Sequence, residues 1–155
     1  MKRHPALVPL SREHYGVLYL AVRLQRATTN SAEQIARELR EQWPAEEGHL
    51  RREEQILLPA YAADPQAVGS DIAQVLDDHE LIRQIVAEIA DCPSLGALRA
   101  LGVKLADHVH YEERVVFPQI QKTLPQADLY ALGARLREDR DADRTRRPAF
   151  PRATA

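Results

Sequence analysis

The chain has 155 residues, 45% of them hydrophobic and 28% charged, with only 6 glycines, and this length and composition favour one all-α domain with a sizeable core. A formal net charge of -2 and few aromatic residues give no reason to expect a nucleic acid or an anionic membrane as a partner. One cysteine excludes an intrachain disulfide, and with no signal-peptide pattern and no apolar run of roughly 20 residues the chain is expected to be cytoplasmic, not membrane-spanning.

The chain is expected to begin with a lead-in and a first long helix. Residues 1–10 contain two prolines and are expected to form an extended lead-in packed on the domain. Ser11 is a candidate N-cap, and apolar residues at helical spacing predict a helix over residues 12–27. His14 lies on the apolar face of this helix.

A second helix is expected to start after Ser31, which can form a capping box with Gln34. Pro44 lacks a backbone N–H and its ring clashes with the preceding turn, so a kink or break is expected near Trp43. The segment that follows, residues 45–61, should start cleanly because proline is favoured in a first helical turn.

Two further long helices are predicted by rows of apolar residues at spacings of three and four. The third helix covers residues 71–91 and the fourth covers residues 95–122, with a bend or an end expected at Pro118. Each row contains one histidine, His79 in the third helix and His108 in the fourth.

A shorter fifth helix is predicted over residues 125–140, where three leucines form a contact face. Residues 141–155 are charged, contain proline and lack apolar periodicity, which predicts a disordered tail. Four long helices with short connections favour an antiparallel up-down four-helix bundle over residues 11–124.

The main motif of the chain is a pair of similar segments, HLRREEQILLP (residues 49–59) and HVHYEERVVFP (residues 108–118). Each reads His-x-x-x-Glu-Glu, followed by a mostly apolar stretch and a proline. Residues four apart on an α-helix lie about 40° apart on one face, so each histidine and the first glutamate of its motif can bind one metal ion. These pairs are His49 with Glu53 and His108 with Glu112.

The other polar residues of the two motifs are predicted to lie off this face. Glu54 and Glu113 lie about 140° from the histidine of their motif, and His110 lies about 160° from His108. These three side chains are expected to point outward or sideways.

Each of the four long helices brings one histidine to its inner face, and two of them add a glutamate. Imidazole suits iron, zinc, copper or nickel, and a pair of bridging carboxylates suits two metal ions a few ångströms apart. The alternative is a metal-free bundle in which these groups satisfy one another, which needs costly charge burial or a closed hydrogen-bond network. The predicted metal ligands are His14, His49, Glu53, His79, His108 and Glu112.

This set resembles the hemerythrin-like (HHE cation-binding) domain family. The resemblance rests on the two HxxxEE...P motifs and on the histidines in REHYGVL and DDHELIR, and it covers residues 10–124. It implies an antiparallel four-helix bundle that holds two iron ions in a non-haem di-iron centre, bridged by carboxylates and an oxo or hydroxo group. Such a centre is able to bind dioxygen or nitric oxide, or to change redox state.

The sequence departs from the oxygen-carrying hemerythrins at two places. Those carriers place two histidines one turn apart on the third helix, whereas Val75 and Arg83 stand one turn from His79 here. The carriers also use an acid five residues after the fourth-helix histidine, where this chain has Glu113, one residue after Glu112. The set is therefore more similar to relatives with four histidines and two glutamates, some of which sense oxygen or iron or act in nitrosative-stress defence.

The leading interpretation is a di-iron protein that binds O2, NO or peroxide and acts in sensing or in oxidative or nitrosative stress defence. A second interpretation is an enzyme that reduces peroxide or nitric oxide, and a third is an iron-handling or structural bundle. Catalytic turnover separates the first two, and metal stoichiometry separates both from the third. The sequence indicates neither the electron donor nor the oligomeric state.

Overall fold

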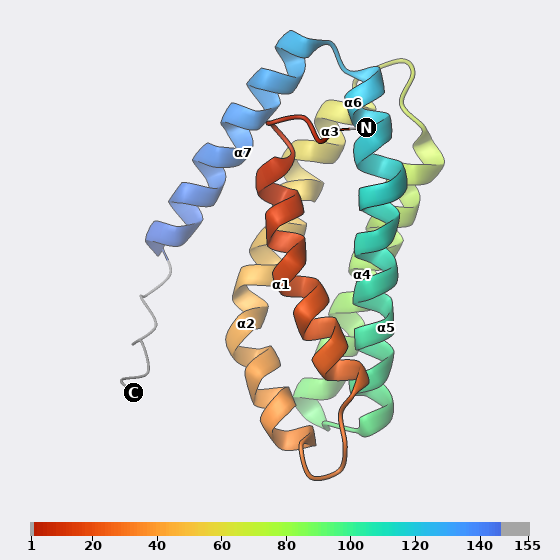
Figure 1. The fold of residues 1–155 in the computed structure, drawn as a ribbon, viewed down its shortest axis with the longest axis vertical. Coiled ribbons are helices and arrows are strands. Elements are labelled where there is room, and N and C mark those ends of the chain that lie inside the picture. The colour runs from red at the N-terminus through yellow and green to blue at the C-terminus, as the bar shows by residue number, and fades with distance from the viewer. Residues whose placement is uncertain (1, 147–155) are drawn as a thin grey trace.

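The computed structural model describes residues 2–146, and every regular element in this range is helical. Four long helical segments run alternately up and down as an antiparallel bundle, and a fifth helix lies along its outside (Figure 1), which confirms the predicted fold class. Within the same range, no helix is long and apolar enough to cross a membrane. The segments are α1 (Val8–Gln25); α2 (Ala32–Arg52), continuing through the π-helical segment η1 (Glu53–Leu57) into α3 (Leu58–Ala62); α4 (Gly69–Asp91); α5 (Leu95–Tyr111), continuing through the π-helical segment η2 (Glu112–Val116) into α6 (Phe117–Thr123); and α7 (Gln126–Arg146).

The bundle interior contains two apolar clusters, separated along its length by a polar layer. One cluster fills the end at which α1 connects to α2 and includes Leu20, Leu24, Leu39, Leu98 and Leu101. The other fills the end at which α6 connects to α7 and includes Leu57, Tyr61, Phe117, Ile120 and Leu132. Along α1, His14 lies between Leu10 of the second cluster and Val17 of the first. Apolar packing therefore seals both sides of the layer that contains the histidines.

Helices α1 and α5 approach each other closely at Gly102. A methyl group at this position would lie 2.7 Å from the backbone oxygen of Ala21 and 2.9 Å from the backbone nitrogen of Gln25. The side-chain amide of Gln25 donates a hydrogen bond to the carbonyl oxygen of Gly102 at 3.0 Å. Because there is no room for a side chain, glycine at this position allows the short spacing of the two helices.

The first helix starts earlier than expected. Helix α1 begins at Val8, so the prediction of an extended lead-in over residues 1–10 is wrong for its last three residues. Pro9 stands in the first turn, where its missing N–H would have no helical partner in any case. Leu7 and Leu10 are buried and tie this turn to the bundle.

The break expected near Trp43 does not occur. Helix α2 stays helical through Pro44. Proline removes one backbone hydrogen bond from a helix. Leu39 before it and Leu50 after it both belong to the buried core, so both parts of the helix are packed against the bundle. Tertiary contacts therefore outweigh the local preference.

The C-terminal helix is longer than predicted. Helix α7 continues to Arg146, so the prediction of a disordered tail is wrong for residues 141–146. The rest of that predicted tail, residues 147–155, lies outside the described residues.

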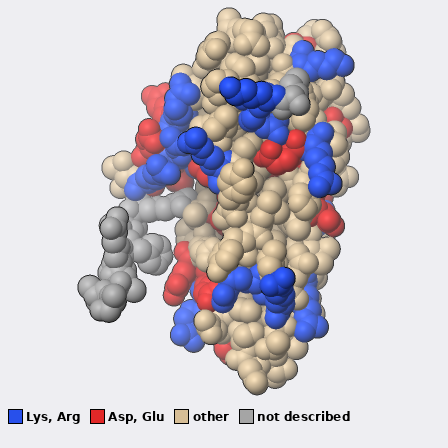
Figure 2. Space-filling model, viewed as in Figure 1, with Lys and Arg blue, Asp and Glu red and all other residues tan. Residues whose placement is uncertain are grey.

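Helix α7 is attached to the bundle by apolar contacts and by ion pairs. Three leucines of α7 are buried in the second apolar cluster. Arg51 of α2 pairs with Asp139 at 2.9 Å, and Arg52 pairs with Asp143 at 3.4 Å. Figure 2 shows basic and acidic side chains interleaved along this helix. The ion pairs extend the helix past the point where its apolar periodicity ends.

Replacing Gly102 with alanine is expected to destabilise the protein by about 1 to 3 kcal/mol, because the added methyl group has to push α1 and α5 apart. Gly16 of α1 is the matched control, since an added methyl group there would meet nothing within 4 Å. Gly16→Ala should leave stability unchanged or raise it by up to about 1 kcal/mol, because alanine favours the helix. Urea unfolding of both variants measures the difference. Equal free energies of unfolding of the Gly102→Ala and Gly16→Ala variants would contradict the close approach of α1 and α5 at Gly102.

Candidate metal centre

Six polar side chains meet in the layer between the two apolar clusters. They come from all four long helical segments, and their exposed fractions lie between 0% and 3%. Burial of so many titratable groups is costly unless each has a partner. The structure thus brings together all six residues that the sequence predicts as metal ligands, namely His14, His49, Glu53, His79, His108 and Glu112.

These side chains form two groups that share both glutamates. In each group, one ligand atom from every member lies within 4.8 Å of the others. Glu53 and Glu112 belong to both groups, so the two carboxylates lie between them. Two histidines complete each group: His14 and His49 in the first, and His79 and His108 in the second.

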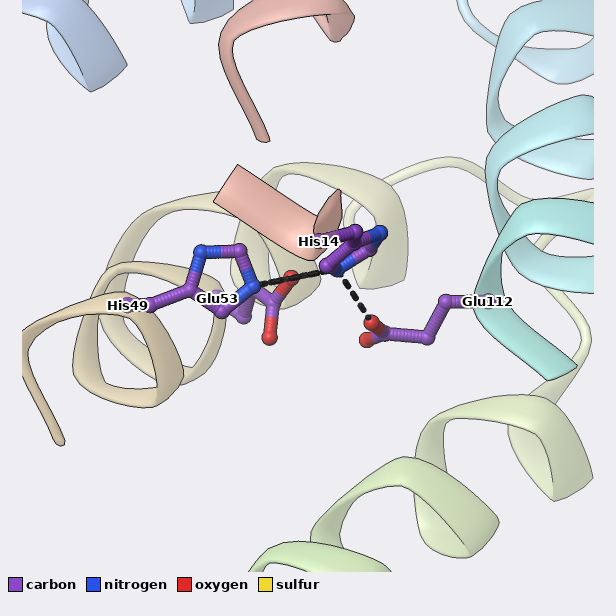
Figure 3. Close-up of side chains that lie close together, drawn as sticks. All are labelled: His14, His49, Glu53 and Glu112. Carbon is purple, nitrogen blue, oxygen red and sulfur yellow. Dashed lines mark hydrogen bonds and ion pairs between the residues drawn. The ribbon is translucent and has the colours of Figure 1, made fainter. Parts of the chain in front are cut away.

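In the first group the Nε2 atoms of His14 and His49 lie 3.1 Å apart (Figure 3). The two rings meet edge to face, with centroids 4.9 Å apart. Glu53 Oε1 lies 3.1 Å from Nε2 of His49, and Glu112 Oε2 lies 3.1 Å from Nε2 of His14. Both imidazole nitrogens therefore point at the same small space as the two carboxylates.

The second group repeats this geometry. The rings of His79 and His108 have centroids 4.8 Å apart and also meet edge to face. Nε2 of His79 lies 3.4 Å from Glu53 Oε2, and Nε2 of His108 lies 3.4 Å from Glu112 Oε2. Glu53 therefore presents one oxygen to each group, and Oε2 of Glu112 faces a histidine of each.

A second layer of carboxylates lies behind the histidines, on the side away from the centre. An ionised carboxylate only accepts hydrogen bonds, so such a partner keeps the ring proton on Nδ1 and leaves the Nε2 lone pair directed at the centre. His108 has a longer contact of this kind, with Asp78 Oδ2 at 3.6 Å from its Nδ1. The other three histidines each donate a hydrogen bond from Nδ1 to an outer carboxylate: His14 to Glu113 (2.7 Å), His49 to Glu13 (2.7 Å) and His79 to Glu54 (2.8 Å).

These contacts shift the pKa values of the residues involved. Burial lowers the pKa of His14, but the contacts with Glu112 and Glu113 outweigh it and raise that pKa to about 9. Burial of a carboxyl group has the opposite effect and raises the pKa of Glu13. Contacts with His49 and Arg52 outweigh this effect and lower the pKa of Glu13 to about 2. The ionised carboxylates therefore make this layer favourable for positive charge, which either a proton or a metal ion can supply.

Several atoms that face the centre have no hydrogen-bond partner among the described residues. They include both carboxylate oxygens of Glu53 and of Glu112, and Nε2 of His79 and of His108. Buried polar atoms in folded proteins are nearly always paired, so a site made of unpaired acceptors calls for a cation. Imidazole nitrogens with carboxylate oxygens suit iron, zinc, copper or nickel. The residues present therefore fit bound metal ions.

Each motif continues into a π-helical turn that begins at its first glutamate. The backbone N–H of Leu58 bonds to the carbonyl of Glu53, five residues back, immediately before Pro59. The proline ring would clash with the carbonyl four residues back in a regular α-helix. The wider turn takes up one extra residue and relieves this clash. The second motif does the same before Pro118, and the helix does not end there but continues through η2 into α6.

Sequence reasoning missed the outer layer of carboxylates. Glu54 and Glu113 point sideways, as expected, but each reaches a histidine of a neighbouring helix, which was not expected. Glu13 and Asp78 were not predicted to take part at all. A signal was present, since each of the four stands next to a predicted ligand in the sequence. His110 is exposed, as predicted.

A small apolar cavity adjoins the centre. Its volume is about 10 Å³, which is room for about one water-sized molecule. It is lined by three of the four histidines, by Glu46 and by the apolar side chains of Val17, Trp43, Leu50, Leu105 and Val109.

Comparison with known proteins identifies one family. The model of the hemerythrin HHE cation binding domain matches residues 8–120, a range that contains all six buried ligand candidates. No curated protein and no solved structure matches the chain.

Replacing Glu53 or Glu112 with alanine is expected to lower the bound transition metal about 10-fold or more, because each glutamate contributes to both groups. His110→Ala is the control, since this side chain is exposed on the same helix as His108. Elemental analysis after equilibration with the metal and removal of the excess measures the content. A similar loss in all three variants would mean that the buried layer is not the metal site.

Proposed function

The chain belongs to the hemerythrin HHE cation-binding domain family, and on that premise we propose that it holds two iron ions in a non-haem di-iron centre and binds a small ligand such as O2, NO or peroxide. The biological role proposed is sensing, or defence against oxidative or nitrosative stress. The observation that carries the proposal is the pair of ligand groups that share Glu53 and Glu112. A single structural ion would need only one such group.

The donor set supports iron as the metal. Each group offers two imidazole nitrogens and carboxylate oxygens, a combination that non-haem Fe(II) sites use together with open coordination positions. When bound, the iron pair supplies a redox-active centre at which a small molecule can bind. One ion would be held by His14 and His49, the other by His79 and His108, and both by Glu53 and Glu112.

The protein itself supplies orientation and exclusion of water. The outer carboxylates hold the histidine rings, and the two apolar clusters close the layer on both sides. The adjoining cavity is mostly apolar and has room for about one water-sized molecule. These features favour a small ligand over a large organic substrate.

The enzymatic alternative is reduction of peroxide or NO at the same centre. Repeated turnover with an added reductant distinguishes this activity from binding alone. A purely structural, metal-free bundle is disfavoured because it would bury both Glu53 and Glu112 with only the facing histidines to balance their charge.

Protein purified without oxygen is expected to contain two iron ions per chain, because the six ligand candidates divide into two equivalent halves. Its optical spectrum should change on exposure to O2, NO or peroxide. Elemental analysis and absorption spectroscopy measure the two quantities. One zinc ion per chain, with no iron-dependent spectrum, would contradict the proposal.

The apolar residue one turn before His79 generates a further prediction. Val75 is fully buried and cannot coordinate a metal, and a histidine there would add a nitrogen on the same helix face. Val75→His is therefore expected to slow oxidation of the reduced, iron-loaded protein by O2, at a stability cost of about 1 to 3 kcal/mol for overpacking. Val75→Leu is the control for added volume, and stopped-flow absorption gives the rates. Equal slowing in both variants would assign the effect to packing.

A further inference from the structure

The outer carboxylates form a closed ring around the bundle. Each belongs to one helical segment and contacts the histidine of the next, so within residues 2–146 every pair of neighbouring segments around the ring is joined in this way. In order, Glu13 of α1 contacts His49 of α2, Glu54 of η1 contacts His79 of α4, Asp78 of α4 contacts His108 of α5, and Glu113 of η2 contacts His14 of α1.

Helical geometry explains how the ring arises. Each outer carboxylate is the sequence neighbour of one of the six inner residues: Glu13 precedes His14, for example, and Glu54 follows Glu53. Successive residues on a helix lie about 100° apart. When one side chain points at the bundle axis, its neighbour therefore points along the interface with an adjacent helix.

Every carboxylate in the ring also contacts a cation. The contacts join Arg52 to Glu13 (2.9 Å), Arg83 to Glu54 (2.7 Å), Arg3 to Glu113 (2.5 Å) and Lys104 to Asp78. Isolated ion pairs on protein surfaces contribute little and follow no pattern. Here the same sequence of histidine, carboxylate and cation occurs at all four histidines, which come from four separate parts of the chain.

This arrangement has a definite physical effect on the histidines. The cation balances the charge of the carboxylate, so the pair adds no net charge to a largely buried region. The carboxylate in turn fixes the ring orientation and makes the other ring nitrogen a better ligand. A ligand held in its binding orientation in advance loses less entropy when it binds.

We propose that the four carboxylate–cation pairs are positioning groups of the metal centre. Each pair holds its histidine with Nε2 directed inward and thereby sets the affinity of the site for iron. The inference rests on the proposed di-iron function and extends it to residues outside the ligand set. The pairs are Glu13 with Arg52, Glu54 with Arg83, Asp78 with Lys104, and Glu113 with Arg3.

Two of these pairs depend on segments outside the four-helix bundle. Arg3 precedes α1 and lies over the ring of Phe117, with its guanidinium carbon 5.1 Å from the ring centroid. Arg52 contacts Asp143 of α7 at 3.4 Å. Both arginines serve the first group of ligands, whereas the cations of the second group lie on α4 and α5. The segment before α1 and helix α7 therefore both support the first group of ligands.

The first test compares two glutamates that contact the same arginine. Arg83 pairs with Glu47 at 2.9 Å and with Glu54 at 2.7 Å, and Glu54 also contacts His79. In the full chain, Glu54→Gln is expected to weaken Fe²⁺ binding about 10-fold or more, and Glu47→Gln by less than about 2-fold. Affinity is measured without oxygen by competition with a coloured chelator. Thermal unfolding of the metal-free variants separates affinity from stability.

Equal Fe²⁺ affinities of these two variants would overturn the positioning role. Failure of the unmodified chain to bind Fe²⁺ would instead overturn the proposed function. Should Glu54→Gln not fold, Asp78→Asn tests the same half of the centre through His108, with the same expected loss.

The second test compares two neighbouring arginines that both contact α7. Arg51 pairs with Asp139 and Asp143, whereas Arg52 pairs with Asp143 and also with Glu13. Arg52→Gln is expected to weaken Fe²⁺ binding about 3-fold or more, and Arg52→Lys to recover most of the affinity because it keeps the charge. Arg51→Gln should leave the affinity unchanged. An equal loss in Arg51→Gln and Arg52→Gln would assign the effect to the attachment of α7 and overturn the role of the cation.

Discussion

The structure depends on a set of electron-pair donors that are buried at one level of the helical bundle. Imidazole nitrogens and carboxylates from four helical segments point at a common space, and the oxygens of Glu53 and Glu112 have no hydrogen-bond partner there among the described residues. In a region of low dielectric such a set is unfavourable unless positive charge accompanies it. A domain of this length can bury enough apolar surface to fold without a metal. The need for a cation therefore comes from the site and not from the fold.

The rest of the bundle keeps these donors at the same level along the bundle axis. Apolar clusters above and below the polar layer fix the register of the helices, and the absence of a side chain at Gly102 lets α1 and α5 pack closely. The two π-helical turns let each motif helix continue past its proline without interruption. A site assembled from four separate helices needs this rigidity, because a shift of one helix along its axis would remove its ligand from the centre.

The properties of the centre follow from its surroundings. Carboxylates on the outer side of the histidines orient the rings, and cations paired with these carboxylates balance their charge, so the inner layer can contain many ionisable groups. The adjoining cavity is small and apolar, which suits a small uncharged molecule better than an organic substrate. Val75 occupies the place one turn from His79 where oxygen-carrying hemerythrins are expected to have another histidine. These three features together are the basis of the proposed reaction with small ligands.

The sequence by itself determined the all-α fold, the four long helices and the six side chains that meet in the interior, because helical periodicity places residues four apart on one face whatever the rest of the chain does. Only the tertiary structure decided which two histidines meet in each group, and that an outer layer of carboxylates contacts them. It also decided that α2 passes through Pro44 unbroken, and that α7 extends through residues 141–146. The physical reason is the same in each case. The rotation and register of one helix against another depend on packing and charge pairing between distant segments, and a local sequence pattern does not specify them.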